Sequence, residues 1–206
     1  MKKSIVQLCL LTALSGAGLL STLNGLAQGA RMLPKGVPEM SVGYTGLTGF
    51  EEGDLLNQLG AGFGIGVTDK VNFRIRYSRL FSDEFDGLNI VSFTPKFALK
   101  QNKISATLPV SVLFAEGESI WAASPGFQFS VGKTNTSELT IGTRCDIPFS
   151  DEIDGVLLSL NVGGGFSRDL DLWAIRPEVG VLFLTEGDEP VFSFGLGANF
   201  SLVSKK

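Results

Sequence analysis

The strongest constraint on the fold is an alternation of side-chain types with a period of two. Over residues 59–67 every odd position is apolar and every even position is glycine. A short polar stretch at residues 68–70 follows, and residues 71–78 then alternate again between apolar and polar side chains. Such alternation predicts β-strands with two chemically different faces, and the tight connection predicts a hairpin. No stretch after Pro34 has the apolar spacing of an amphipathic helix.

The same pattern divides the rest of the chain into ten segments of suitable length. Strands are predicted at residues 37–46, 58–67, 71–81, 88–99, 104–114, 120–131, 138–148, 156–166, 171–183 and 191–202. Each is close to the roughly 9–11 residues that a tilted strand needs to cross a bilayer. We therefore expect an all-β, up-and-down antiparallel transmembrane β-barrel of about ten strands. A count of eight or twelve strands follows if one hairpin is misread, because strand boundaries read from sequence are inexact.

Every second connection between these strands is acidic. The carboxylates concerned are Glu51, Glu52, Asp54, Asp83, Glu84, Asp86, Glu116, Glu118, Asp151, Glu152, Asp154, Glu186, Asp188 and Glu189. In an up-and-down meander, alternate connections lie at the same end, so one rim is predicted to be strongly negative. Such a rim is interpreted either as solvated loop tips or as a contact surface for divalent cations, which prefer carboxylate oxygens. None of the loops has the spacing of a dedicated calcium loop, so no metal site is assigned.

The polar faces of the strands distinguish a membrane barrel from a soluble ligand-binding barrel. Their residues are mostly glycine, serine and threonine, whereas a water-exposed exterior would carry lysine and glutamate. Aromatic residues on the apolar faces gather near both strand ends, as in the girdles of outer-membrane barrels. One group comprises Tyr44, Tyr77, Phe114, Trp121, Phe149, Phe183 and Phe192, and the other Phe73, Phe97, Phe129, Phe166, Trp173 and Phe200. These features favour an apolar face directed at lipid.

The mature chain resembles the OmpA- and OmpX-like class of small outer-membrane barrels. Its last strand, residues 191–200, is similar to the alternating, aromatic-ending signal by which such barrels are inserted, although residues 201–206 follow the aromatic. The segment at residues 30–36 also looks like an entry motif of small uncharacterised barrels. The resemblance implies a place in a bacterial outer membrane. It also implies outer-membrane lipid and the barrel-insertion machinery as partners.

Residues 1–27 are predicted to be a cleaved signal peptide, which leaves residues 28–206 as a single barrel domain. Lys2 and Lys3 precede an apolar stretch, and a small-residue sequence ends at Ala27. An uncleaved anchor helix is the alternative. Cleavage changes the net charge from −4 to −6, so no nucleic-acid partner is expected. It also leaves Cys145 as the single cysteine, which excludes an internal disulfide bond.

The predicted lumen carries eight charged side chains. They are Glu39, Arg74, Arg76, Lys96, Arg144, Asp146, Arg176 and Glu178. We expect Arg144 to pair with Asp146 and Arg176 with Glu178, because each pair shares one strand face. One interpretation is a plug of ion pairs, and the other is a narrow channel with a slight preference for anions. Bends or bulges are expected at Pro95, Pro109, Pro125 and Pro177.

These features favour a non-enzymatic barrel with a structural or surface-interaction role. The chain contains no histidine, which excludes the usual Ser-His-Asp hydrolases and histidine-ligated metals. No catalytic residues and no cofactor are predicted. A porin-like transporter of small solutes is the alternative function.

Overall fold

The computed structural model describes residues 29–48, 55–82, 85–115, 118–131, 134–149, 156–184 and 190–202. These residues form strands β1 (Pro38–Thr48), β2 (Leu56–Thr68), β3 (Val71–Ser82), β4 (Phe85–Lys100), β5 (Ile104–Thr107), β6 (Val110–Ala115), β7 (Glu118–Ala123), β8 (Gly126–Val131), β9 (Ser137–Pro148), β10 (Leu157–Phe166), β11 (Trp173–Leu184) and β12 (Val191–Ser201). None of these residues belongs to a helix long and apolar enough to cross a membrane.

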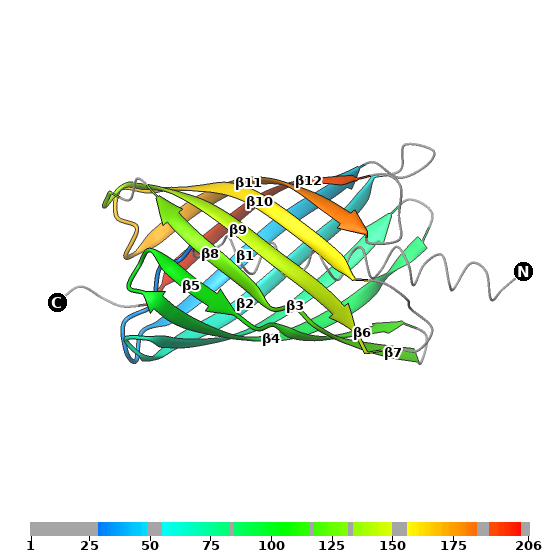
Figure 1. Cartoon of the computed structure of the whole chain (residues 1–206), viewed down its shortest axis with the longest axis horizontal. Coiled ribbons are helices and arrows are strands. Elements are labelled where there is room, and N and C mark those ends of the chain that lie inside the picture. Colours follow the sequence, from blue (N-terminus) through cyan, green and yellow to red (C-terminus); the bar gives the residue numbers. More distant parts are fainter. Residues whose placement is uncertain are drawn as a thin grey trace, which may run out of the picture.

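The strands form one closed barrel, visible from its side in Figure 1. Each ladder between neighbouring strands is antiparallel. The wall closes where β1 pairs with β12 over a ladder that runs from Glu39↔Ser201 to Thr48↔Phe192. Since β5 and β6 together make one passage across the wall, as do β7 and β8, the barrel has ten wall positions. The predicted ten-stranded up-and-down barrel is therefore confirmed.

Prolines explain why two of the ten passages are each divided into two strands. The predicted strand 104–114 breaks at Pro109 and the strand 120–131 breaks at Pro125, because proline donates no ladder hydrogen bond. Pro95 lies where β4 exchanges one partner for the other, between its ladders with β6 and β5. At Pro177 the β10–β11 ladder runs from Gly163↔Glu178 directly to Phe166↔Ile175, without a change of register. The strands are thus interrupted at Pro109 and Pro125, whereas β4 and β11 continue through Pro95 and Pro177.

The outer surface of the barrel is apolar. Val179 near the middle of β11 is 61% exposed, and Leu160 and Ile141 on neighbouring strands are also exposed. Trp121 and Phe149 are half-exposed or more towards one end of the wall. Burying such a surface in lipid is favourable, whereas a soluble barrel would have to hold it in water. The exterior therefore fits a transmembrane barrel and excludes the soluble alternative.

The two ends of the barrel differ in their connections. At the turn end, β2 and β3 are joined at residues 69–70, β4 and β5 at residues 101–103, and β10 and β11 at residues 167–172. The opposite end, called the loop end below, carries the acidic connections. Of the fourteen predicted rim carboxylates, Asp86 lies near the start of β4 and Glu118 is the first residue of β7. The other twelve lie outside the described residues. The predicted signal peptide lies outside them too.

Candidate functional site in the barrel lumen

Charged side chains line the inside of the barrel. The eight residues predicted from the alternation all occupy inward positions, and each is at most 8% exposed. A ninth inward charge is Glu138 at the start of β9, which is 3% exposed. Glu138 has the same parity as Arg144 and Asp146 on its strand, so the alternation contained the signal for it. The sequence analysis nevertheless missed this carboxylate.

Residues 29–37, called the N-terminal segment below, occupy the turn end of the lumen. Ala30 and Met32 are buried there. The Ala30 amide donates a hydrogen bond to Ser130 Oγ on β8 at 2.9 Å. The Met32 amide donates to Asn102 Oδ1 in the β4–β5 turn at 3.1 Å. These contacts tie the segment to two places on the wall, so it forms an internal plug.

Lys96 on β4 holds the same segment through its carbonyl groups. Lys96 Nζ donates to the carbonyl oxygen of Gly29 at 2.5 Å and to that of Arg31 at 2.8 Å. A charged donor strengthens such hydrogen bonds relative to neutral ones. Lys96, predicted only as a lumen charge, therefore clamps the N-terminal segment.

Gly66 at the turn end of β2 lets the N-terminal segment approach the wall closely. The Gly36 amide donates to Gly66 O at 2.7 Å, and the Gly66 amide donates to Val37 O at 3.1 Å. A Cβ atom on Gly66 would lie 2.6 Å from Leu33 O and still closer to Pro34 O. Any larger residue would therefore collide with the backbone of the segment. The sequence alternation places a glycine at this position, but it does not reveal that the N-terminal segment packs against it.

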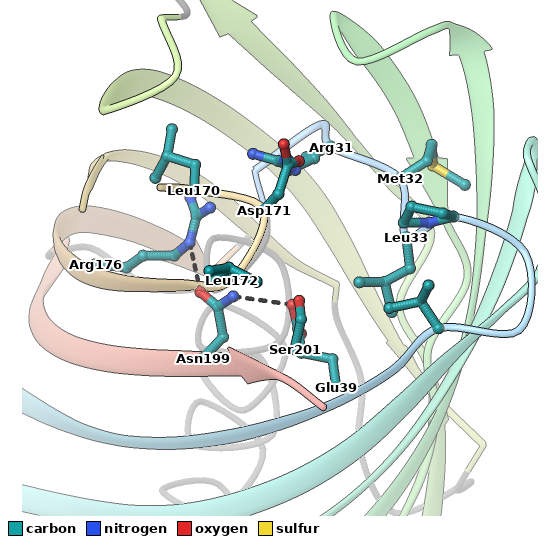
Figure 2. A pocket seen from close by; sticks show the side chains of 12 residues that line it. Arg31, Met32, Leu33, Glu39, Leu170, Asp171, Leu172, Arg176, Asn199 and Ser201 are labelled. Atoms are coloured by element: carbon teal, nitrogen blue, oxygen red, sulfur yellow. Dashed lines mark hydrogen bonds and ion pairs between the residues drawn. The ribbon is translucent and has the colours of Figure 1, made fainter. Parts of the chain in front are cut away.

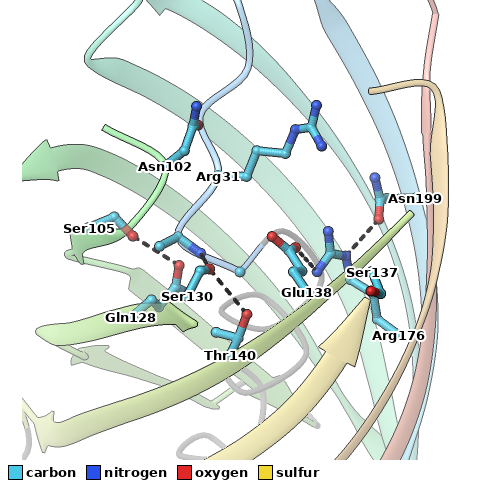
Figure 3. Close-up of polar contacts among 12 residues, drawn as sticks. Arg31, Asn102, Ser105, Gln128, Ser130, Ser137, Glu138, Thr140, Arg176 and Asn199 are labelled. Carbon is cyan, nitrogen blue, oxygen red and sulfur yellow. Dashed lines mark hydrogen bonds and ion pairs between the residues drawn. The ribbon is translucent and has the colours of Figure 1, made fainter. Parts of the chain in front are cut away.

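A network of ion pairs lies against the plug. Arg74 on β3 forms an ion pair with Glu39 on β1, and Arg176 on β11 forms one with Glu138. Asn199 joins the two pairs, as Figures 2 and 3 show in part. Its Oδ1 atom accepts from Arg176 Nε at 3.0 Å, and its Nδ2 atom donates to Glu39 Oε2 at 2.9 Å. The network couples five strands, β1, β3, β9, β11 and β12.

The partner of Arg176 differs from the predicted one, Glu178. Arg176 and Glu178 share one face of β11, but Arg176 forms its ion pair with Glu138 on β9 instead. Strand β10 lies between β9 and β11, and its Gly165 has no side chain to separate Arg176 from Glu138. A Cβ atom there would lie 2.7 Å from Arg176 Nη1 and 3.0 Å from Glu138 Cγ. A glycine on the intervening strand thus allows this pair to form.

The predicted pairing of Arg144 with Asp146 is present. Arg144 Nε donates to both carboxylate oxygens of Asp146, at 2.8 Å and 3.0 Å. Glu178, by contrast, acts electrostatically on Arg76 of β3. The inward charges are therefore arranged so that acids and bases lie near one another.

Arg31 of the N-terminal segment reaches the β10–β11 turn, where it forms an ion pair with Asp171. Burial lowers the pKa of Arg31 from its ordinary value, and the nearby Glu138 opposes this shift. The carboxylates of Asp169 and Glu39 also favour the charged form and so oppose this fall in pKa.

Two cavities open between the N-terminal segment and the turns. One, of about 160 Å³, is shown in Figure 2 and is lined by Arg31, Leu33, Leu170, Arg176 and Asn199 among others. The second, of about 290 Å³, is lined mainly by polar residues of the turns. Among the described residues, no group of three or more cysteine, aspartate or glutamate side chains is placed to hold a metal ion.

The loop end of the lumen is apolar. We define the aliphatic ring by nine buried, inward-facing side chains that form one packed cluster: Leu47, Leu56, Leu80, Leu88, Ile90, Leu113, Leu157, Leu182 and Val191. They come from eight strands. The sequence analysis assigned apolar residues to the outer face and missed this ring. Counting the alternation through to the strand ends reveals it, since Leu47 has the parity of Glu39 and Leu80 has that of Arg74.

Comparison with known proteins identifies the fold. No protein-family model matches the chain, and no curated protein matches it. Among solved structures, the chain is similar to the translocator domain of autotransporter NalP from Neisseria meningitidis, with 10% identity, a TM-score of 0.50, and coverage of 92% of this chain and 96% of that chain.

Two further solved structures are similar to this chain over most of its length. An outer membrane channel from Pseudomonas putida F1 has 12% identity and a TM-score of 0.48 over 84% of this chain and 98% of that chain. Ail, the attachment invasion locus protein of Yersinia pestis, has 11% identity and a TM-score of 0.34 over 82% and 99%. Together with the closed wall and its apolar exterior, the similarity to the NalP domain shows that this chain has the fold of an outer-membrane β-barrel.

Proposed function

We propose that the protein is a non-enzymatic outer-membrane β-barrel that is closed to ions at rest and has a structural or surface-interaction role. The observation that carries this proposal is the N-terminal segment inside the lumen. Its amides bind Ser130 and Asn102, and its carbonyl groups bind Lys96. A lumen filled in this way leaves the surface of the barrel, rather than its interior, available for function.

The location and orientation follow from the exterior and from the predicted leader. The apolar wall supports insertion in a bilayer, and the predicted signal peptide at residues 1–27 supports export. Insertion then uses the barrel machinery, which reads β12 and Phe200 near its end. An even number of passages puts the start of β1 and the end of β12 at the turn end, and we infer that this end faces the periplasm and that the acidic loop end faces outside. The acidic rim is the part of the surface that would meet cations, lipid headgroups or a partner.

A non-enzymatic role is supported by the way the charged side chains of the lumen pair with one another. Arg74, Glu39, Arg176 and Glu138 are engaged with one another through ion pairs and through Asn199. Such pairs stabilise a filled interior. The sequence has no histidine to act as a general base near neutral pH.

A narrow channel with a preference for anions is the second candidate. The nine inward charges on the strands include five basic residues and four acidic ones. Arg74 Nε and Arg144 Nη2 are buried and have no hydrogen-bond partner among the described residues. A passing anion would satisfy such donors, provided that the N-terminal segment moved aside.

Planar-bilayer recording of the refolded mature chain, residues 28–206, separates the two functions. We expect a silent bilayer from protein whose heat-dependent gel mobility shows a folded barrel. Steady current that prefers anions, and that changes in the double variant Arg74→Ala/Arg176→Ala, would contradict the closed barrel and support the channel.

A further inference from the structure

The polarity of the lumen changes abruptly near the loop end. On β1 the inward residue is Thr45 and the next inward residue is Leu47, and on β3 the same step leads from Ser78 to Leu80. Equivalent steps occur from Gln58 to Leu56, Ser92 to Ile90, Ser111 to Leu113, Ser159 to Leu157 and Ser193 to Val191. Seven strands therefore pass from a hydrogen-bonding side chain to an aliphatic one within two residues. These seven hydrogen-bonding side chains, called the polar belt below, border the aliphatic ring.

The strand register brings the members of the ring side by side. Leu47 pairs with Leu56 across β1 and β2, and Leu80 pairs with Leu88 across β3 and β4. The ladders also pair Ile90 with Leu113 and Leu182 with Val191. Inward side chains on paired positions contact each other directly. The ring is thus one packed row over eight strands and not a set of isolated leucines, and on β9 the residue paired with Leu157 is Asp146.

The polar belt beneath the ring needs hydrogen-bond partners that the ring cannot supply. Thr45 Oγ1, Gln58 Oε1 and Ser159 Oγ are buried without a partner among the described residues. Water satisfies such groups in protein interiors. Aliphatic side chains cannot replace the hydration shell of an ion. A narrow apolar constriction also holds no continuous water, so ions cannot cross it in hydrated form.

We propose that the aliphatic ring is an ion barrier, separate from the N-terminal segment at the other end of the lumen. The segment closes the turn end by hydrogen bonds to Lys96, Ser130 and Asn102. The ring closes the loop end by apolar packing. Each barrier blocks ions without the other. A solute able to pass the ring has to be uncharged and apolar.

Four forms of the mature protein test the proposal in a planar bilayer: the unchanged chain, a release variant, a ring variant and their combination. The release variant is Gly66→Ala, which frees the N-terminal segment from the lumen. Lys96→Met is a second variant with the same expected effect. The ring variant replaces Leu80, Leu113 and Leu182 by asparagine, which is polar, smaller than leucine and, like leucine, branched at Cγ. The same three changes to methionine give an apolar control. If the triple variant lacks the heat-dependent gel mobility of a folded barrel, the pair Leu47→Asn/Leu182→Asn replaces it.

We expect steady current from the combined variant alone, and silence from the combination that carries methionine in the ring. Current from the release variant would overturn the ring as a barrier while leaving the plug in place. Current from the ring variant would instead show that the N-terminal segment does not seal the lumen, which contradicts the proposed closed state. Silence from the combined variant, or current from its methionine counterpart, would also overturn the inference.

Discussion

Replacing Gly66 by alanine releases the N-terminal segment from the lumen. The added Cβ atom collides with Leu33 O and Pro34 O, and the hydrogen bonds of Gly66 with Gly36 and Val37 are lost. Two such hydrogen bonds contribute roughly 2 kcal/mol, which is more than a tenfold change in the population of the released state. Trypsin then cleaves after Arg31 at least about ten times faster. Mass spectrometry of the digest in detergent measures this cut separately from one after Lys35.

Gly197→Ala is the matched control for this substitution. Gly197 also faces the lumen, on β12, but a Cβ atom there meets its nearest neighbour, Val42 O, at an ordinary 3.7 Å. We expect its cleavage rate to equal that of the unchanged chain. Equal rates for the two alanine variants would contradict the close contact between Gly66 and the segment.

Replacing Arg176 by methionine strongly destabilises the barrel. Glu138 is left buried without its ion partner, and Asn199 loses the donor at Arg176 Nε. Removing one member of a buried ion pair typically costs about 3–5 kcal/mol. Urea-induced unfolding in phospholipid vesicles, followed by tryptophan fluorescence, measures the loss.

Two further variants show whether the loss of stability comes from the Glu138 carboxylate, which Arg176→Met leaves without an ion partner. Adding Glu138→Gln to Arg176→Met removes the unpaired charge, so part of the stability returns. Arg168→Met changes an exposed arginine in the β10–β11 turn and is expected to alter stability by less than about 1 kcal/mol. The account fails if Arg176→Met is as mild as Arg168→Met, or if Glu138→Gln restores nothing.

The alternation was enough to predict the barrel because each side chain of a strand has only two faces to choose from. It located ten passages, and the physics of proline explains why two of them divide at Pro109 and Pro125. The inward charges followed from the same parity. Glu138 and the aliphatic ring were within reach of that parity but required it to be followed to the ends of each strand.

The alternation could not predict the position of the N-terminal segment or the partner of Arg176, because both depend on contacts between distant parts of the chain. Residues 29–37 have no period that reveals a place inside the barrel. Gly66 is one of four alternating glycines on β2, and nothing local distinguishes the one that touches the segment. Arg176 reaches Glu138 only because Gly165 lies on the strand between them. Such interactions require knowledge of the strand order.

Nuclear magnetic resonance of the folded mature chain in detergent micelles tests the plugged lumen most directly. Contacts between the Ala30 amide and the side chain of Ser130, with slow hydrogen exchange at Ala30 and Met32, are the predicted result. Random-coil chemical shifts and fast exchange across residues 29–37, with no contact to the wall, would contradict the account.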